Sequence, residues 1–369
     1  MPNITGLVLI TAQEGDREDL DDRIFDASPY DTPLIATVPK EDAKHEKHDW
    51  IEDQITGLSD VLTASLDAST TAVPVTDGTK FLANDIIVIE AEGMLVTAVS
   101  ANNLTVVRGY GDTTAAIHAG FPTAYIIAPA MLEGADARDA STTTKSKAYN
   151  HCQIFQDTVS VSSSEIEIVT VGGNEWLYQV HKKTKEHAVK VERSFIHGYR
   201  VARVANTTRG SAGGIKQWIT SEVLDRANGT LTLQQYETML RGIYDNGGNP
   251  TLAYVSPLGM QTMNFWAEGR IETKSGERQF GLAVGELITC FGKQEIILSR
   301  HVGLGNDTTT GDIFAIQADL LAVSTLIPTK LEKLGKTGLS EKGMISTEMT
   351  FHRGCEYAHG RVFNISGGA

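Results

Sequence analysis

The sequence predicts a mixed α+β protein in which a small all-β module interrupts a longer chain. Three observations support this prediction. Residues 174–198 carry an apolar stripe with helical spacing. Residues 59–130 hold short β-branched runs separated by Gly, Asn and Asp, with no room for crossover helices. The segments that flank this module, 44–58 and 150–170, have the residue pattern of extended chain.

The composition is that of an ordinary soluble globular protein. The chain has 369 residues, 41% of them apolar, which is enough for one large core or two to three smaller ones. Its 32 basic and 46 acidic residues give a formal charge of −14, and no basic run is present. This charge disfavours a protein that binds nucleic acid phosphates. It is compatible with a container wall to which DNA does not adhere, and equally with plain solubility.

The three cysteines, Cys152, Cys290 and Cys355, are far apart and form no CxxC pair. Neither a zinc site nor a disulfide framework is indicated, and a reducing compartment is expected. The short apolar run at the N-terminus lacks a basic region and is followed by acidic residues, unlike a signal peptide. No apolar segment is long enough to span a bilayer, so no membrane partner is expected.

Residues 1–40 are expected to form an arm. Acidic residues crowd positions 14–26, and Pro29 and Pro33 then favour extended backbone. Such an arm needs a partner to order it. Around Trp50, residues 44–58 predict a strand exposed on both faces, as in a projecting hairpin.

The inserted module, residues 59–130, is predicted to be a compact barrel or sandwich. Its β-branched runs recur about every ten residues, at 81–89, 94–99, 104–109 and 123–127. In the following segment, 150–170, Val159 alternates with Val161, and this segment is expected to pair with the strand near Trp50. The module would then lie at the tip of one long hairpin.

Residues 174–198 give the strongest helix prediction. Asn174 suits the N-cap, Glu175 the first turn, and Gly198 the end. At 1.5 Å per residue the helix would be roughly 36 Å long. His187 and Glu192 are expected on its polar faces. The apolar stripe consists of Leu177, Val180, Thr184, Ala188, Val191 and Phe195.

The C-terminal half alternates between helices and strands. A Gly-rich loop, 205–230, precedes predicted helices at 232–245 and 257–268. A final β-hairpin is expected to pair residues 345–351 with 358–365 through a turn at 352–354. The other predicted strands lie at 251–255, 285–291, 294–299, 312–317 and 320–326.

No catalytic, cofactor or metal site is predicted. His45 and His48 would share a metal on a helix, but on a strand they point to opposite faces, and two flanking lysines oppose a cation. The loop at 209–214 lacks both the Gly-x-Ser-x-Gly elbow and the phosphate-binding Gly-x-x-x-x-Gly-Lys pattern. Because no nucleophile and base share a known local signature, an enzyme is not expected.

Several short motifs follow one another in a characteristic order along the chain. They are Ser28-Pro29-Tyr30-Asp31-Thr32-Pro33, His48-Asp49-Trp50-Ile51-Glu52-Asp53, residues 150–162, Gly173-Asn174-Glu175, Arg209-Gly210 with Gly213-Gly214-Ile215, Lys336-Thr337-Gly338, and His359-Gly360. No single motif is specific, but their order resembles that of the SU10-type major head proteins of tailed phages, which share the HK97-like capsid fold. The resemblance covers most of the chain outside 59–130.

The resemblance implies a division of the chain into the parts of that fold. These are an N-terminal arm (1–40), an E-loop hairpin (41–58 and 131–160) that carries the inserted β-module (59–130), a peripheral domain (161–204 and 327–369) with the long spine helix, and an axial domain (205–326).

The implied function is that of a major capsid protein. Its copies would assemble in the bacterial cytoplasm, through hexamers and pentamers, into a closed icosahedral-type head shell around double-stranded DNA, with portal, scaffolding and decoration proteins as partners. The alternatives are an encapsulin-like compartment shell, a tail or decoration protein, and a β-rich hydrolase. The candidate assembly contacts are Tyr30, Trp50, Glu52, Asp53, Phe155, Trp176 and Arg209; for Trp50 and Trp176, core packing is the alternative.

Overall fold

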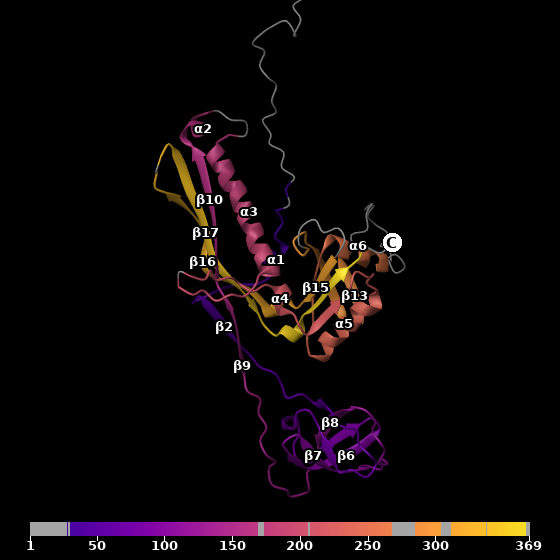
Figure 1. Cartoon of the computed structure of the whole chain (residues 1–369). Helices are drawn as coiled ribbons and strands as arrows, with labels where there is room; N and C mark the ends of the chain where they lie inside the picture. Colours follow the sequence, from indigo (N-terminus) through magenta and orange to yellow (C-terminus); the bar gives the residue numbers. More distant parts are fainter. Residues whose placement is uncertain are drawn as a thin grey trace, which may run out of the picture. The chain divides into compact units, whose positions relative to one another are not determined.

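The computed structural model describes residue 28 and residues 30–168, 173–205, 207–267, 285–303, 311–336 and 338–366. Most of the predicted arm, 1–40, therefore lies outside the described residues. The chain divides into two compact units. We call residues 51–147 the inserted unit, and residues 1–50 with 148–369 the main unit. Figure 1 labels the elements of both.

The inserted unit is an all-antiparallel sheet of six strands in the order β3-β8-β5-β6-β7-β4. The β-branched runs at 81–89, 94–99, 104–109 and 123–127 supply its four longest strands. Alternate side chains of these strands form a buried core that includes Ile87, Met94 and Leu104. The strands are β3 (Ser59–Val61), β4 (Ala72–Pro74), β5 (Asp85–Ile89), β6 (Glu92–Ser100), β7 (Asn103–Val107) and β8 (Thr123–Pro129), with a 3-10 turn η2 (Gly78–Lys80).

A buried ion network holds one edge of this core together. Arg108 donates to both carboxylate oxygens of Glu92, over 2.7 and 2.8 Å, and His118 Nε2 lies 3.0 Å from Glu92 Oε2. Burial alone would raise the pKa of Glu92, but these hydrogen bonds and two backbone N–H groups lower it to about 2. The carboxylate is therefore charged at neutral pH and fully paired.

The first sheet of the main unit has four strands in the order β1-β16-β17-β10. They are β1 (Lys40–Asp42), β10 (Gln153–Ser162), β16 (Leu321–Leu334) and β17 (Ser340–Arg353). The long helix α3 (Glu175–His197) lies along β10 and β17 (Figure 1). Their shared core includes Phe155, Phe195 and Phe351.

Helix α3 begins and ends where the sequence predicts. The side chain of Asn174 accepts the N–H of Leu177, and Gly198 follows the last turn. Gly198 is required because a Cβ there would lie 2.4 Å from the carbonyl oxygen of Ala212. The burial prediction is wrong for four residues of this helix. His187 and Glu192 are buried, because partners on other elements satisfy their polar atoms. Leu177 and Thr184, which belong to the predicted apolar stripe, are exposed.

The second sheet of the main unit has six strands in the order β11-β18-β15-β12-β14-β13. The predicted helices at 232–245 and 257–268 are present as α5 (Leu233–Asp245), which Thr232 caps with a capping box, and α6 (Pro257–Ala267). Both pack against this sheet. The strands are β11 (Glu222–Asp225), β12 (Leu252–Val255), β13 (Glu286–Thr289), β14 (Gly292–Leu298), β15 (Gly311–Ile316) and β18 (Gly360–Ile365).

The remaining described elements are short. They are α1 (Pro33–Thr37), β2 (Lys47–Glu52), β9 (Ser146–His151), α2 (Ser163–Glu167), α4 (Ile215–Trp218) and the 3-10 turns η3 (Ala318–Leu320) and η4 (Glu356–Ala358).

Two strand-pairing predictions are wrong. The expected closing hairpin does not form, because β17 pairs with β10 and β16, whereas β18 joins the other sheet between β11 and β15. The left-handed backbone of Cys355 and the turn η4 redirect the chain between the two sheets. The strand near Trp50, β2, was predicted to pair with segment 150–170. It pairs instead with β9, of which only the last two residues belong to that segment.

Candidate functional site

The predicted assembly contacts are spread over several elements, although Trp50 and Glu52 share β2. Tyr30 is exposed, with Lys185 Nζ 4.1 Å from its ring centre. Asp53 and Arg209 are exposed, and Glu52 is half-buried. Three aromatic candidates are packed within the chain. They are Trp50 on β2, Phe155 on β10 and Trp176 on α3.

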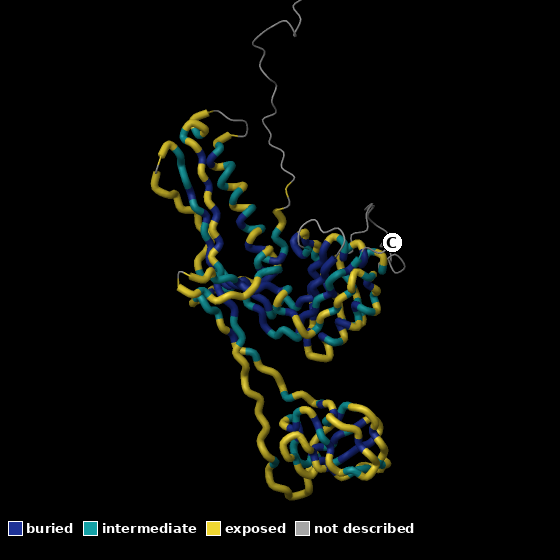
Figure 2. Tube along the Cα trace, in the orientation of Figure 1, coloured by how far each residue is buried: buried dark blue, intermediate teal, exposed yellow. Residues whose placement is uncertain are grey.

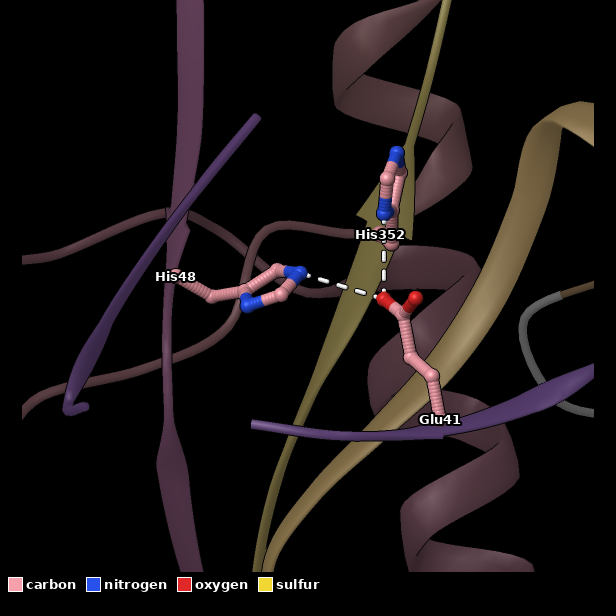
Figure 3. Close-up of side chains that lie close together, drawn as sticks. All are labelled: Glu41, His48 and His352. Carbon is pink, nitrogen blue, oxygen red and sulfur yellow. Dashed lines mark hydrogen bonds and ion pairs between the residues drawn. The ribbon is translucent and has the colours of Figure 1, made fainter. Parts of the chain in front are cut away.

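Trp50 leads to a polar cluster that the sequence did not predict. Its ring stacks on His352 at a centroid distance of 4.6 Å. His352 Nδ1 lies 3.0 Å from Glu41 Oε1, and His48 Nε2 lies 3.1 Å from the same oxygen. Figure 3 shows the two imidazoles converging on this carboxylate from different strands. We call Glu41, His48 and His352 the His–Glu cluster.

Strand register explains why the His–Glu cluster converges. Glu41 on β1 lies opposite Ser324 on β16, and Ser324 lies opposite Thr350 on β17. His352 is two residues beyond Thr350, so it shares that face of the sheet. His48 and Trp50 are likewise two residues apart on β2, and both contact His352. One face of β2 is therefore covered, contrary to the prediction of a strand exposed on both sides.

From the sequence, His45 and His48 were the pair considered as metal ligands, but their side chains do not lie together in the structure. His45 Nδ1 accepts the N–H of Lys47 instead. Lys47, one of the lysines expected to repel a cation, lies 3.4 Å from Asp49 and over the ring of Tyr149. The alternation of His48 and Trp50 indicated a shared face, but nothing in the sequence indicated that residue 352 lies beside it.

A second polar feature is a cavity of about 290 Å³ lined by Arg200, Gln217, Trp218 and Arg353. Arg353 is only 3% exposed and donates to the carbonyl oxygen of Gly214 over 2.9 Å. Its Nε has no hydrogen-bond partner, and no carboxylate pairs with it among the described residues. Burial and the nearby Arg200 lower the pKa of Arg353 to about 10. An unpaired buried guanidinium favours an anionic partner.

Glu192 joins the long helix to the segment that follows Pro33. Its two carboxylate oxygens accept the backbone N–H groups of Leu34 and Ile35, over 2.8 and 3.0 Å. Burial raises the pKa of Glu192 to about 7, although these two hydrogen bonds oppose the rise. The N-terminal turn α1 is thereby fastened to α3, with Leu34 in the core.

Two segments of the inserted unit bury almost none of their side chains. Residues 53–58 and 131–147 are exposed along most of their length, as Figure 2 shows. They include large apolar side chains, with Ile55 exposed by 90% and Leu132 by 85%. In the described part of the chain no helix is long and apolar enough to cross a membrane.

Comparison with solved structures shows the fold. A chain from Gordonia phage Cozz matches with a TM-score of 0.51 and 12% identity, covering 98% of this chain and 96% of that one. A chain from Mycobacterium phage Bobi matches with a TM-score of 0.51 and 8% identity, covering 96% of each. The match to the holo-SrpI encapsulin of Synechococcus elongatus PCC 7942 has a TM-score of 0.45 and 10% identity, and covers 61% of this chain and 78% of that one.

The mixed α+β architecture is similar to that of HK97-like phage capsid proteins. No curated protein matches the sequence. The family model of the SU10 major capsid protein matches residues 4–366, and the chain belongs to this family. It is a structural protein of the phage head shell and not an enzyme. The resemblance drawn from the order of sequence motifs is confirmed.

Proposed function

We propose that this major capsid protein closes its shell chiefly through the exposed segments 53–58 and 131–147, which pack against neighbouring copies. The observation that carries this proposal is their lack of burial despite side chains such as Ile55 and Leu132. Ordering an extended segment costs about 1–2 kcal/mol per residue in backbone entropy. A segment that buries little in its own chain gains little against that cost until another molecule covers it.

We assign these segments to the E-loop, residues 41–58 and 131–160, which carries the β-module 59–130. The arm is 1–40. The peripheral domain contains 161–204, with α3 as its spine, and residues 327–369 apart from β18. The axial domain contains 205–326. Because β18 pairs with β15 and β11, we place Gly360–Ile365 with the axial domain rather than the peripheral one.

The predicted contacts take different roles in this proposal. Tyr30, Asp53 and Arg209, which are exposed, and Glu52 would face neighbouring copies. Trp50, Phe155 and Trp176 are packed in their own chain and would act by holding the elements that make the contacts.

The cavity at Arg353 is proposed as a further contact, which takes a carboxylate from a neighbouring copy. The chain has 46 acidic residues against 32 basic ones, so acidic side chains abound on the surface of any neighbour. A carboxylate placed there would pair with Arg353 and Arg200 together. Charge-assisted hydrogen bonds of this kind are shorter and roughly twice as strong as neutral ones.

The remaining parts of the function follow from the family role. The shell, built of hexamers and pentamers in the host cytoplasm, would enclose double-stranded DNA without reading its sequence. The net charge of −14 supports a wall that repels the phosphate backbone. Portal, scaffolding and decoration proteins are the proposed partners.

The experiment compares assembly of the wild-type chain with Ile55→Asp and Leu132→Asp, using sedimentation velocity and negative-stain microscopy. Both variants are expected to assemble at least tenfold less, with unchanged unfolding of the free chain. Ile117→Asp is the control, because Ile117 is equally apolar and 71% exposed but lies outside the two segments. Wild-type shell yields from both variants would contradict the proposal.

A further inference from the structure

We propose that Glu41, His48 and His352 bind a divalent transition-metal ion, with zinc as the ion that fits best. This inference is independent of the assembly contacts above. It concerns a site inside the main unit that would join three strands brought together only by folding. Glu41 and His352 are 311 residues apart in the sequence.

The spacing of the ligand atoms suits such an ion. Glu41 Oε1, His48 Nε2 and His352 Nδ1 all lie within 4.8 Å of one another. The two nitrogen–oxygen separations are 3.0 and 3.1 Å. Zinc binds imidazole nitrogen and carboxylate oxygen at about 2.0–2.2 Å in a tetrahedron, which places neighbouring ligand atoms roughly 3.3 Å apart. Small side-chain movements would therefore admit the ion.

The ligand types also favour zinc. Two imidazoles and one carboxylate form a borderline donor set that suits zinc, cobalt and nickel better than calcium or magnesium, which prefer oxygen ligands alone. The site is open on one side, because the Glu41 and His352 side chains are exposed by 38% and 25%. Solvent can reach it, so an ion has an entry path and water can supply the fourth ligand.

Neighbouring side chains hold the three ligands in place. The buried Ser324 hydroxyl donates to Glu41 Oε1 over 2.5 Å, and the indole of Trp50 stacks on His352 with an interplanar angle of 20°. In metalloproteins, side chains that contact the metal ligands in this way fix the orientation of those ligands. Without an ion, the hydrogen bonds of both histidines to Glu41 hold the three side chains together.

The test begins with untagged chain stripped by a chelator and titrated calorimetrically with zinc chloride. We expect one ion per chain at this site, and with cobalt chloride the visible absorption of a tetrahedral complex. His48→Gln and His352→Gln should each weaken zinc binding at least tenfold. His45→Gln is the matched control, because His45 lies on the same segment outside the cluster, and it should bind zinc as the wild type does.

A second measurement needs no variant and covers the case in which a substitution prevents folding. Carbethoxylation of histidines in the wild-type chain, mapped by mass spectrometry, should be blocked by zinc at His48 and His352 but not at His45. Absence of zinc binding, or binding that both variants retain with no protection of these two histidines, would overturn the proposal and leave a hydrogen-bonded cluster only.

Discussion

Glu192 offers a test of how the N-terminal turn is fastened to the long helix. Its buried carboxylate accepts two backbone N–H groups, from Leu34 and Ile35. Glu192→Gln keeps the size of the side chain and one carbonyl oxygen acceptor. It removes the charge and turns an NH₂ group toward the second backbone N–H. The variant therefore exchanges the cost of a buried charge for the loss of one hydrogen bond.

The magnitude follows from the pKa. Burial raises the pKa of Glu192 from 4.5 to about 7. Because the folded pKa lies above the ordinary value, the contribution of this group to stability is complete below about pH 4.5 and is lost as the pH rises through 7. Each unit of difference between the folded and unfolded pKa is worth about 1.4 kcal/mol of unfolding free energy. The full loss for Glu192 is therefore about 3 kcal/mol. Between pH 5 and pH 8 we expect about 2–3 kcal/mol of it.

The assay is urea unfolding of the unassembled chain at pH 5 and pH 8, followed by tryptophan fluorescence. All four tryptophans lie in the main unit, so the signal reports on the unit that contains Glu192. The unfolding free energy of the wild type relative to Glu192→Gln should fall by about 2–3 kcal/mol from pH 5 to pH 8. Because both proteins share all other titratable groups, subtracting the two unfolding free energies at each pH removes the contribution of those groups.

The control is Glu186→Gln on the same helix, where the carboxylate is partly exposed and pairs with Lys183. Its stability relative to the wild type should change little between the two pH values. If the difference in unfolding free energy between Glu192→Gln and the wild type is the same at pH 5 and pH 8, burial does not raise the pKa of this carboxyl and the reasoning is refuted.

Three further predictions concern buried groups and close packing. Arg108→Met removes the guanidinium that pairs with the buried carboxylate of Glu92 and should destabilise the inserted unit by about 3–5 kcal/mol, seen as faster hydrogen exchange in β6 and β7; unchanged exchange would contradict it. Gly214→Ala places a Cβ 2.7 Å from backbone atoms at the end of α3 and should lower the thermal midpoint sharply; a wild-type midpoint would contradict it. Thiol reagents should modify exposed Cys290 but not Cys152, whose pKa burial raises to about 11; equal rates would contradict it.

Local signals in the sequence determined much of this protein. The cap at Asn174 and the stop at Gly198 bound α3, and the β-branched runs in 59–130 became β5 to β8. These predictions succeeded because helix caps and strand periodicity act between residues close in the chain. The order of such signals along the chain was also sufficient to indicate the capsid family.

Only the tertiary structure decided which distant strands meet. It separated β17 from β18 into different sheets and buried His187 and Glu192 on a helix face that the sequence assigned to solvent. It also brought His48 and His352 to one carboxylate. The physical reason is that periodicity tells which residues share a face of an element, whereas the partner of that face depends on contacts between segments hundreds of residues apart.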